Sequence, residues 1–243
     1  MNFSLAIDND LASELCKFRG NSSYDFKVIE KTLHYYKDYP LFTREFLQRY
    51  YKDAALLGQI LSAKCTLDFN SLENISKATI YKVILTGDKS KSFPYICIKG
   101  DIIENNFTAS FFKNQSRQKA KLHIKNLLEN AQSVFIYDAY LFEKNVWEAF
   151  VSLARECFPR TALNVFYART SKGQGLQAKL SQIKQINREW KISEDKKHKE
   201  FTNLHDRYLI IDDKIELIFT SGIEYLMDES KDFTYVVRVH KTR

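Results

Sequence analysis

The feature that most constrains the fold is an alternation of strand-like and helix-like segments in the second half of the chain. Apolar residues that recur every second position give way to apolar residues that recur every third or fourth position. In chain order these segments are 133–142, 143–157, 161–168, 175–190 and 191–194. Strands that alternate with amphipathic helices favour a largely parallel sheet covered by helices.

Residues 203–226, NLHDRYLIIDDKIELIFTSGIEYL, interrupt this alternation with a strand–turn–strand pattern. The run YLIID is apolar at successive positions, which is typical of a central strand covered on both faces. The residues DDK at 212–214 predict a tight turn into an antiparallel strand, and 232–240 predicts one more strand. The start of the first strand and the end of the second should therefore be neighbours.

The first half of the chain reads differently and contains no catalytic motif that we recognise. Helical patterns occupy 25–63, with a stop at Pro40 and a restart for which Thr43 is the expected N-cap. Short strand-like runs follow from 64 to 112. We therefore predict an N-terminal α+β region over 1–113 and an α/β domain over 114–243, in which a mixed sheet is flanked by helices and which opens with a basic helix.

Composition limits the function classes. The formal net charge is +7 and the pI is near 9.0, which favours an anionic partner such as nucleic acid, a phospholipid surface or a phosphorylated metabolite. No signal-like start and no apolar window of membrane-spanning length is visible, so the expected compartment is the cytoplasm. The four cysteines are far apart, and no His or Cys spacing suggests a metal. No cofactor is expected.

His205 and Arg207 are the main candidates for chemistry. Residues two apart on a strand point to the same face, so the imidazole and the guanidinium should project side by side. Arginine matches phosphate oxygens with a planar fork, and histidine can act as a nucleophile or as a general acid or base near neutral pH. A carboxylate such as Asp212 or Glu224 could hold the imidazole in one tautomer. The alternative is a β-hairpin with a polar entrance and no site.

Several other residues are candidates for binding substrate. Ser221 and Tyr225 lie near the end of the second hairpin strand, and Asp138 and Tyr140 follow a strand of the predicted parallel sheet, where open α/β sheets bind ligands. A helix cap is the alternative role for Asp138. Two basic groups are either solvated faces or polyanion-binding sites. The first is Lys196, Lys197 and Lys199 with His198, and the second is Arg117, Lys119, Lys121 and Lys125.

The stretch HDRYLIID resembles the His-x-Lys-x-x-x-x-Asp signature of the phospholipase D superfamily, with Arg207 in place of Lys and Asp212 in the acid position. The order of segments from about 115 onward is similar to one half of that fold. A nearer likeness is to the phospholipase D-like domain at the C-terminus of MIT-domain-containing proteins and its prokaryotic relatives. It rests on FIYDAYLFEKN (135–145) and on HDR…TSGIEYL, and covers about half of the chain.

This resemblance implies two different activities. Active nucleases of the superfamily form a phosphohistidine without a metal, and members with one motif form homodimers to bring two histidines together. The MIT-associated relatives instead bind anionic lipid without catalysis. This chain departs from the active pattern at Arg207 and where Thr220–Gly222 replaces Gly-Ser-x-Asn. The basic helices favour nucleic acid over lipid, so we predict a homodimeric, metal-independent nuclease. The alternatives are a non-catalytic phosphate-binding module and a purely structural protein. The resemblance to prokaryotic relatives also implies a role in prokaryotic defence or nucleic-acid processing.

Overall fold

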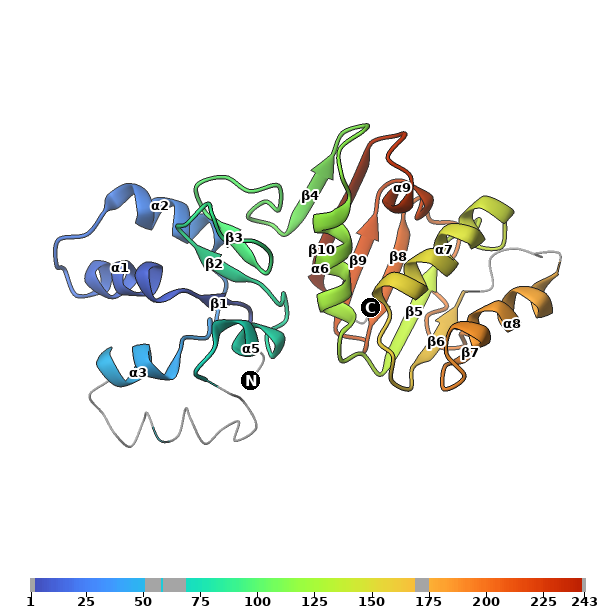
Figure 1. The fold of residues 1–243 in the computed structure, drawn as a ribbon, viewed down its shortest axis with the longest axis horizontal. Coiled ribbons are helices and arrows are strands. Elements are labelled where there is room, and N and C mark those ends of the chain that lie inside the picture. Colours follow the sequence, from blue (N-terminus) through green and yellow to red (C-terminus); the bar gives the residue numbers. More distant parts are fainter. Residues whose placement is uncertain (1–2, 51–57, 59–68, 169–174, 242–243) are drawn as a thin grey trace. The chain divides into compact units, whose positions relative to one another are not determined.

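The computed structural model describes residues 3–50, 58, 69–168 and 175–241, and it divides the chain into two compact units (Figure 1). The first unit spans Met1–Asn105 and the second spans Asn106–Arg243. The second unit begins earlier than the expected boundary after residue 113, because β4 (Thr108–Phe111) pairs with the last strand of the chain. Among the described residues, no helix is both long and apolar enough to cross a membrane.

The first unit contains a small sheet whose pairs are parallel, in the order β1-β2-β3. The unit combines helices with this small sheet, and its N-terminal strand β1 pairs with β2, which comes much later in the chain. As predicted, Thr43 accepts a hydrogen bond from the backbone N–H of Phe46 at 3.2 Å. The expected helix and strand between 51 and 68 lie outside the described residues, apart from position 58. The elements are β1 (Ala6–Ile7), α1 (Asn9–Arg19), α2 (Phe26–Tyr35), α3 (Arg44–Tyr50), α5 (Leu72–Lys77), β2 (Ile84–Thr86) and β3 (Tyr95–Cys97).

The second unit is mixed α/β, with a seven-stranded sheet in the order β4-β10-β9-β8-β5-β6-β7. Only β5, β6 and β7 are parallel to one another. The sheet is thus mixed, as predicted, because β8 joins β5 in the antiparallel sense and β9, β10 and β4 continue that pattern. The remaining strands are β5 (Ser133–Tyr137), β6 (Asn164–Tyr167), β7 (Lys191–Glu194), β8 (Arg207–Ile211), β9 (Ile215–Phe219) and β10 (Phe233–Val239).

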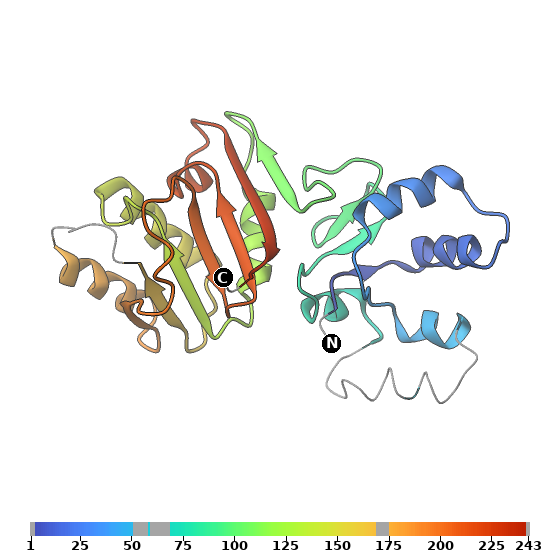
Figure 2. The same cartoon turned by 180° about the vertical axis from the view of Figure 1, so that it is seen from behind.

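Helices cover one face of this large sheet. In Figure 1, α6, α7 and α9 lie over the strands, and α8 packs against α7 and β7. Their bounds are α6 (Gln118–Leu128), α7 (Lys144–Cys157), α8 (Leu176–Ile186) and α9 (Glu224–Met227). Seen from behind, no helix formed by the described residues covers the sheet (Figure 2). A segment without regular structure, residues 195–206, crosses part of this second face, and we call it the crossing segment.

The hairpin of β8 and β9 agrees with the sequence. β8 is the middle strand of the sheet, and Leu209, Ile210 and Ile211 are buried. Asp212 and Asp213 turn the chain with φ values of +51° and +52°, a left-handed conformation that Asp and Asn tolerate better than most residues. The central, doubly covered strand that the sequence predicted is therefore confirmed.

Candidate active site

The polar residues of interest meet where β5 ends and β8 begins. The pairing of Tyr137 with Tyr208 places Asp138, the next residue of the chain, beside Arg207 on the neighbouring strand. The pairing of Arg207 with Phe219 brings the end of β9 to the same edge. The hairpin therefore carries its two polar ends to one place, as the antiparallel arrangement predicted.

Arg207 lies at the centre of this edge, with its side chain 20% exposed. Its Nε lies 3.7 Å from Oδ2 of Asp138, and one terminal nitrogen donates a hydrogen bond to the backbone oxygen of His205 at 2.9 Å. The guanidinium carbon lies 5.8 Å from the centre of the Tyr140 ring, which is within cation–π range. The guanidinium is thus partly shielded from water while part of it stays accessible.

Asp138 is buried, and its environment disfavours negative charge. Burial raises the pKa of its carboxyl above the ordinary value, and the negative charges of Glu224 and Glu143 act in the same direction. The Tyr140 N–H, which donates to Oδ1 at 2.8 Å, and the Arg207 charge oppose this rise without cancelling it. The carboxylate of Asp138 is therefore more easily protonated than that of an ordinary, solvent-exposed aspartate.

The chain after β9 adds two buried polar atoms. Oγ of Ser221 and Oε2 of Glu224 are shielded from solvent, and neither has a hydrogen-bond partner among the described residues. Gly222 makes room for this arrangement, because a Cβ there would collide with the Glu224 carboxylate. Buried polar atoms without partners are rare in folded proteins, and functional sites are one place where they occur.

His205 lies in a bend just before β8, and its side chain is exposed. The preceding residue is held in place by Tyr137, which is buried beneath the crossing segment. The Tyr137 hydroxyl accepts a hydrogen bond from the Leu204 N–H at 2.8 Å and donates one to the Leu204 oxygen at 3.2 Å. These bonds tether the backbone that leads to His205, whose exposed imidazole is accessible to a substrate.

Asp212 is not brought to this edge. It lies past the far end of β8, where its Oδ1 accepts hydrogen bonds from the backbone N–H groups of Gln132 and Ser133 at 2.9 and 2.8 Å. The Ser133 hydroxyl is a third partner at 3.3 Å. Asp212 therefore anchors the start of β5 to the hairpin turn, and its position does not allow it to orient His205.

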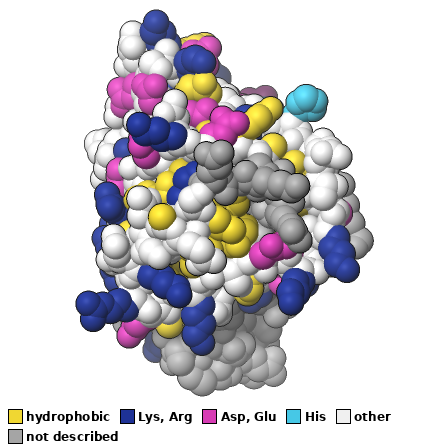
Figure 3. Space-filling model, turned by 90° about the vertical axis from the view of Figure 1, so that its right-hand side faces the viewer, with side chains coloured by type: hydrophobic (Ala, Val, Ile, Leu, Met, Phe, Trp, Pro, Cys, Tyr) yellow, Lys and Arg dark blue, Asp and Glu magenta, His cyan; other side chains and the backbone are white. Residues whose placement is uncertain are grey.

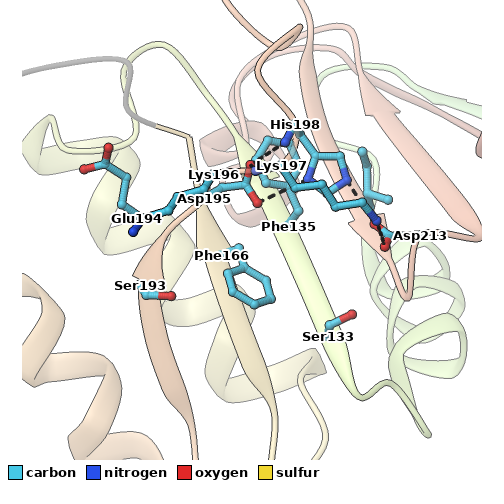
Figure 4. A pocket seen from close by; sticks show the side chains of 11 residues that line it. Ser133, Phe135, Phe166, Ser193, Glu194, Asp195, Lys196, Lys197, His198 and Asp213 are labelled. Atoms are coloured by element: carbon cyan, nitrogen blue, oxygen red, sulfur yellow. Dashed lines mark hydrogen bonds and ion pairs between the residues drawn. The ribbon is translucent and has the colours of Figure 1, made fainter. Parts of the chain in front are cut away.

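The lysine run also lies at that far end. Lys197 forms an ion pair with Asp213, and Nε2 of His198 lies 2.9 Å from Oδ1 of Asp213. Nδ1 of His198 is 3.3 Å from Oδ1 of Asp195, and the imidazole stacks on Phe135 with ring centres 4.4 Å apart (Figure 4). These contacts attach the crossing segment to the sheet. The remaining members of the run, Lys196 and Lys199, are exposed.

Two further candidates have structural partners. The Tyr225 hydroxyl lies 2.8 Å from Nζ of Lys231. Arg117 is almost fully buried and binds the backbone oxygens of several residues: Phe112, Gln115, Tyr225 and Lys231. The Arg117 side chain is thus an internal clamp, and only the lysines of that helix remain for a polyanion. Among them, Lys121 is paired with Glu156 at 3.0 Å.

Sequence reasoning missed Tyr137, Asp213 and Gly222. The alternation of β5 puts Tyr137 on the face opposite to the helices, but no pattern in the sequence showed that the crossing segment would cover it. The turn assignment did include Asp213, although its ion pair needed the tertiary fold. Gly222 follows the end of a strand, where a glycine is a usual sign of close approach.

Comparisons with known proteins give only a distant likeness. No protein-family model and no curated protein matches the sequence. Among solved structures, NucT from Helicobacter pylori is 14% identical over 54% of this chain and 84% of that chain, with a TM-score of 0.32. Nuc from Salmonella typhimurium, a phospholipase D family member, is 12% identical over 56% of this chain and 84% of that chain, with a TM-score of 0.29. Likeness at this level does not identify what this chain does.

Proposed function

We propose that the chain is a phosphodiesterase of the phospholipase D-like type that cleaves nucleic acid as a homodimer. The observation that carries the proposal is the edge of the sheet where the partly shielded guanidinium of Arg207 lies beside the buried acid Asp138, with Glu224 near enough to raise the Asp138 pKa. The exposed side chain of His205 belongs to the residue two positions before Arg207. The basic net charge of +7 supports a polyanionic substrate. The resemblance of HDRYLIID to the superfamily signature agrees with this chemistry.

In the proposed reaction, a ring nitrogen of His205 attacks the phosphorus while Arg207 neutralises the equatorial oxygens. A P–N bond forms, one P–O ester bond breaks, and its electron pair leaves with the departing oxygen. That oxygen takes a proton from the second copy's imidazole, which is why a dimer is part of the proposal. Water then hydrolyses the P–N bond, which releases a phosphate monoester and restores the histidine.

A second function is favoured by two departures of the sequence from the pattern of the active nucleases. Arginine in place of lysine, and Thr-Ser-Gly in place of Gly-Ser-x-Asn, suit a site that holds a phosphate on nucleic acid or anionic lipid without cleaving it. The nearer likeness to the MIT-associated domain stays a prediction, and it would imply this activity. The two functions differ in what they require of His205, because only catalysis needs the imidazole itself.

The test compares the wild-type protein with His205→Ala, Arg207→Ala and His34→Ala, where His34 is an exposed histidine on α2 that serves as the matched control. End-labelled single-stranded DNA, duplex DNA and RNA are incubated with each protein in excess EDTA. Cleavage that persists in EDTA, survives His34→Ala and disappears in His205→Ala and Arg207→Ala is the expected result. Absence of cleavage, with polyanion binding retained in His205→Ala and lost in Arg207→Ala, would contradict the nuclease and support the non-catalytic phosphate-binding module.

A further inference from the structure

A hollow of about 430 Å³ lies on the face of the large sheet that carries no helix, beside the crossing segment (Figure 4). Phe166 from β6 lies in its floor, with Ser193 on one side and Ser133 on the other. Phe135 and Ile210, both buried, complete the apolar base. The hollow is therefore apolar at its centre, and it carries hydroxyl groups at its sides.

The register of the strands explains this arrangement. Phe166 pairs with Ser193 on β7, and Asn164 pairs with Lys191. Because side chains alternate along a strand, these four residues point to the same face. Phe166 is half-buried, whereas Asn164, Lys191 and Ser193 are exposed. The result is a partly open aromatic ring with Asn164, Lys191 and Ser193 on the same face of the sheet. Three acidic residues, Glu194, Asp195 and Asp213, also line the hollow.

The charges around the hollow leave room for an anion. Asp195 is bound to His198, and Asp213 is bound to both His198 and Lys197, so these two carboxylates are engaged within the crossing segment and its anchor. The Glu194 carboxylate extends away from Phe166 in Figure 4. Lys196 is exposed at the rim. On the side of the molecule seen in Figure 3, Lys and Arg side chains are interspersed with Asp and Glu side chains and with visible hydrophobic groups.

We propose that this hollow is a stacking platform for an unpaired base of single-stranded nucleic acid. The base would lie on the Phe166 ring with Ser133 and Ser193 at its edges, while Lys191 and Lys196 meet the flanking phosphates. Open sheet faces with an accessible aromatic ring and nearby cations bind single strands in this way, because every base offers a π-face. Bases stacked inside a duplex cannot reach such a ring. The inference rests on the proposed function and names its substrate class.

The test measures binding of fluorescent oligo-dT, oligo-U and a blunt duplex by anisotropy, with excess EDTA present. The variants are Phe166→Leu, which keeps an apolar side chain but removes the π-face, and Phe166→Trp, which keeps stacking. Phe166→Leu should weaken binding of both single strands about tenfold and leave the duplex unchanged, whereas Phe166→Trp should bind as the wild type does. Similar losses for oligo-dT and oligo-U would show that the base is bound rather than the sugar.

The phosphate contacts are tested through salt dependence. Lys196→Gln should reduce the slope of log affinity against log salt for oligo-dT by about 0.7. Lys184→Gln, on the exposed surface of α8, is the matched control and should leave the slope unchanged. Far-UV circular dichroism of each variant confirms that the protein remains folded.

Equal binding by Phe166→Leu and the wild type, or equal losses for single strands and duplex, would overturn the platform. These outcomes are separate from those of the proposed function. Binding to single strands that depends on Phe166 without any cleavage would keep the platform and remove the nuclease. Cleavage that depends on His205 with no effect of Phe166→Leu would keep the nuclease and remove the platform.

Discussion

The two ends of strand β8 both gather charged residues, yet they differ in how well those residues are satisfied. At the β8–β9 turn, Asp212 accepts from three donors, and Asp213 is bound by Lys197 and His198. At the other end, burial raises the pKa of Asp138, and a buried oxygen of Glu224 has no hydrogen-bond partner among the described residues. Satisfied charges hold a fold together, whereas under-satisfied ones indicate where a ligand is to be bound.

The largest effect on stability should come from the turn. Asp212→Ala removes the acceptor for two backbone N–H groups and places alanine at a left-handed position, which should lower the free energy of unfolding by about 2–4 kcal/mol. Urea denaturation measures this loss, and Asp212→Asn, which tolerates the conformation and keeps one acceptor, should lose less. Nucleic-acid cleavage by the folded Asp212→Ala protein should be unchanged. A selective loss of cleavage would place Asp212 in the catalytic site after all.

At the other end of the strand, removing the carboxylate of Asp138 should raise the free energy of unfolding. The folded-state pKa of Asp138 is raised, so ionisation of its carboxyl removes stability as the pH rises through that pKa. Asp138→Asn should therefore be more stable than the wild type at pH 8, on the order of 1 kcal/mol, with a smaller difference at pH 4. Denaturation at the two pH values measures the difference in the free energy of unfolding between Asp138→Asn and the wild type. A difference that shrinks toward pH 8 would show that Asp138 stabilises the fold as an anion.

A smaller effect is expected for Asp213. Burial alone would raise its pKa, but the contacts with Lys197 and His198 lower it below the ordinary value. The stability that this carboxylate contributes is present above the unfolded pKa and is lost as the pH falls through the lowered one. Because 39% of its side chain is exposed, Asp213→Asn should cost less than about 1 kcal/mol at pH 7. The cost should vanish in acid, and a cost independent of pH would mean that the ion pair contributes nothing.

The smallest effect on stability is expected at Gly222. A methyl group there would displace the Glu224 carboxylate, which is the end of a flexible side chain, so Gly222→Ala should cost only about 0.5 kcal/mol. Moving this negative charge away should lower the pKa of Asp138, which carbon-detected NMR titration of the aspartate carboxyls can follow. Glu224→Gln is the matched variant and should lower it too. An unchanged pKa in both variants would mean that Glu224 does not act on Asp138.

The sequence predicted most of the second unit because its elements are defined by local patterns. From residue 133 onward, apolar residues at every second position alternate with apolar residues at every third or fourth position, and this pattern predicted the strands and helices. The apolar run before Asp212 identified the central strand. What the sequence did not give was the assembly of β4 with β10 or the parallel pairing of β1, because both join residues far apart in the chain. For the same reason it grouped Asp212 with His205, although a strand separates them. The side-by-side projection of His205 and Arg207 was predicted for two residues of one strand, but β8 begins at Arg207 and His205 lies in the bend before it. The hydrogen bond that joins them runs from the Arg207 guanidinium to the backbone oxygen of His205 and does not involve the imidazole.

The most direct test of the central claim is to trap the covalent intermediate. The wild-type protein is mixed with excess single-stranded DNA, quenched in denaturant at alkaline pH, where a phosphohistidine survives, and digested for mass spectrometry. The account predicts a nucleotide adduct on the peptide that contains His205, absent from His205→Ala and present in His34→Ala. Efficient cleavage with no adduct on His205, or an adduct on another residue, would contradict the assignment of His205 as the nucleophile.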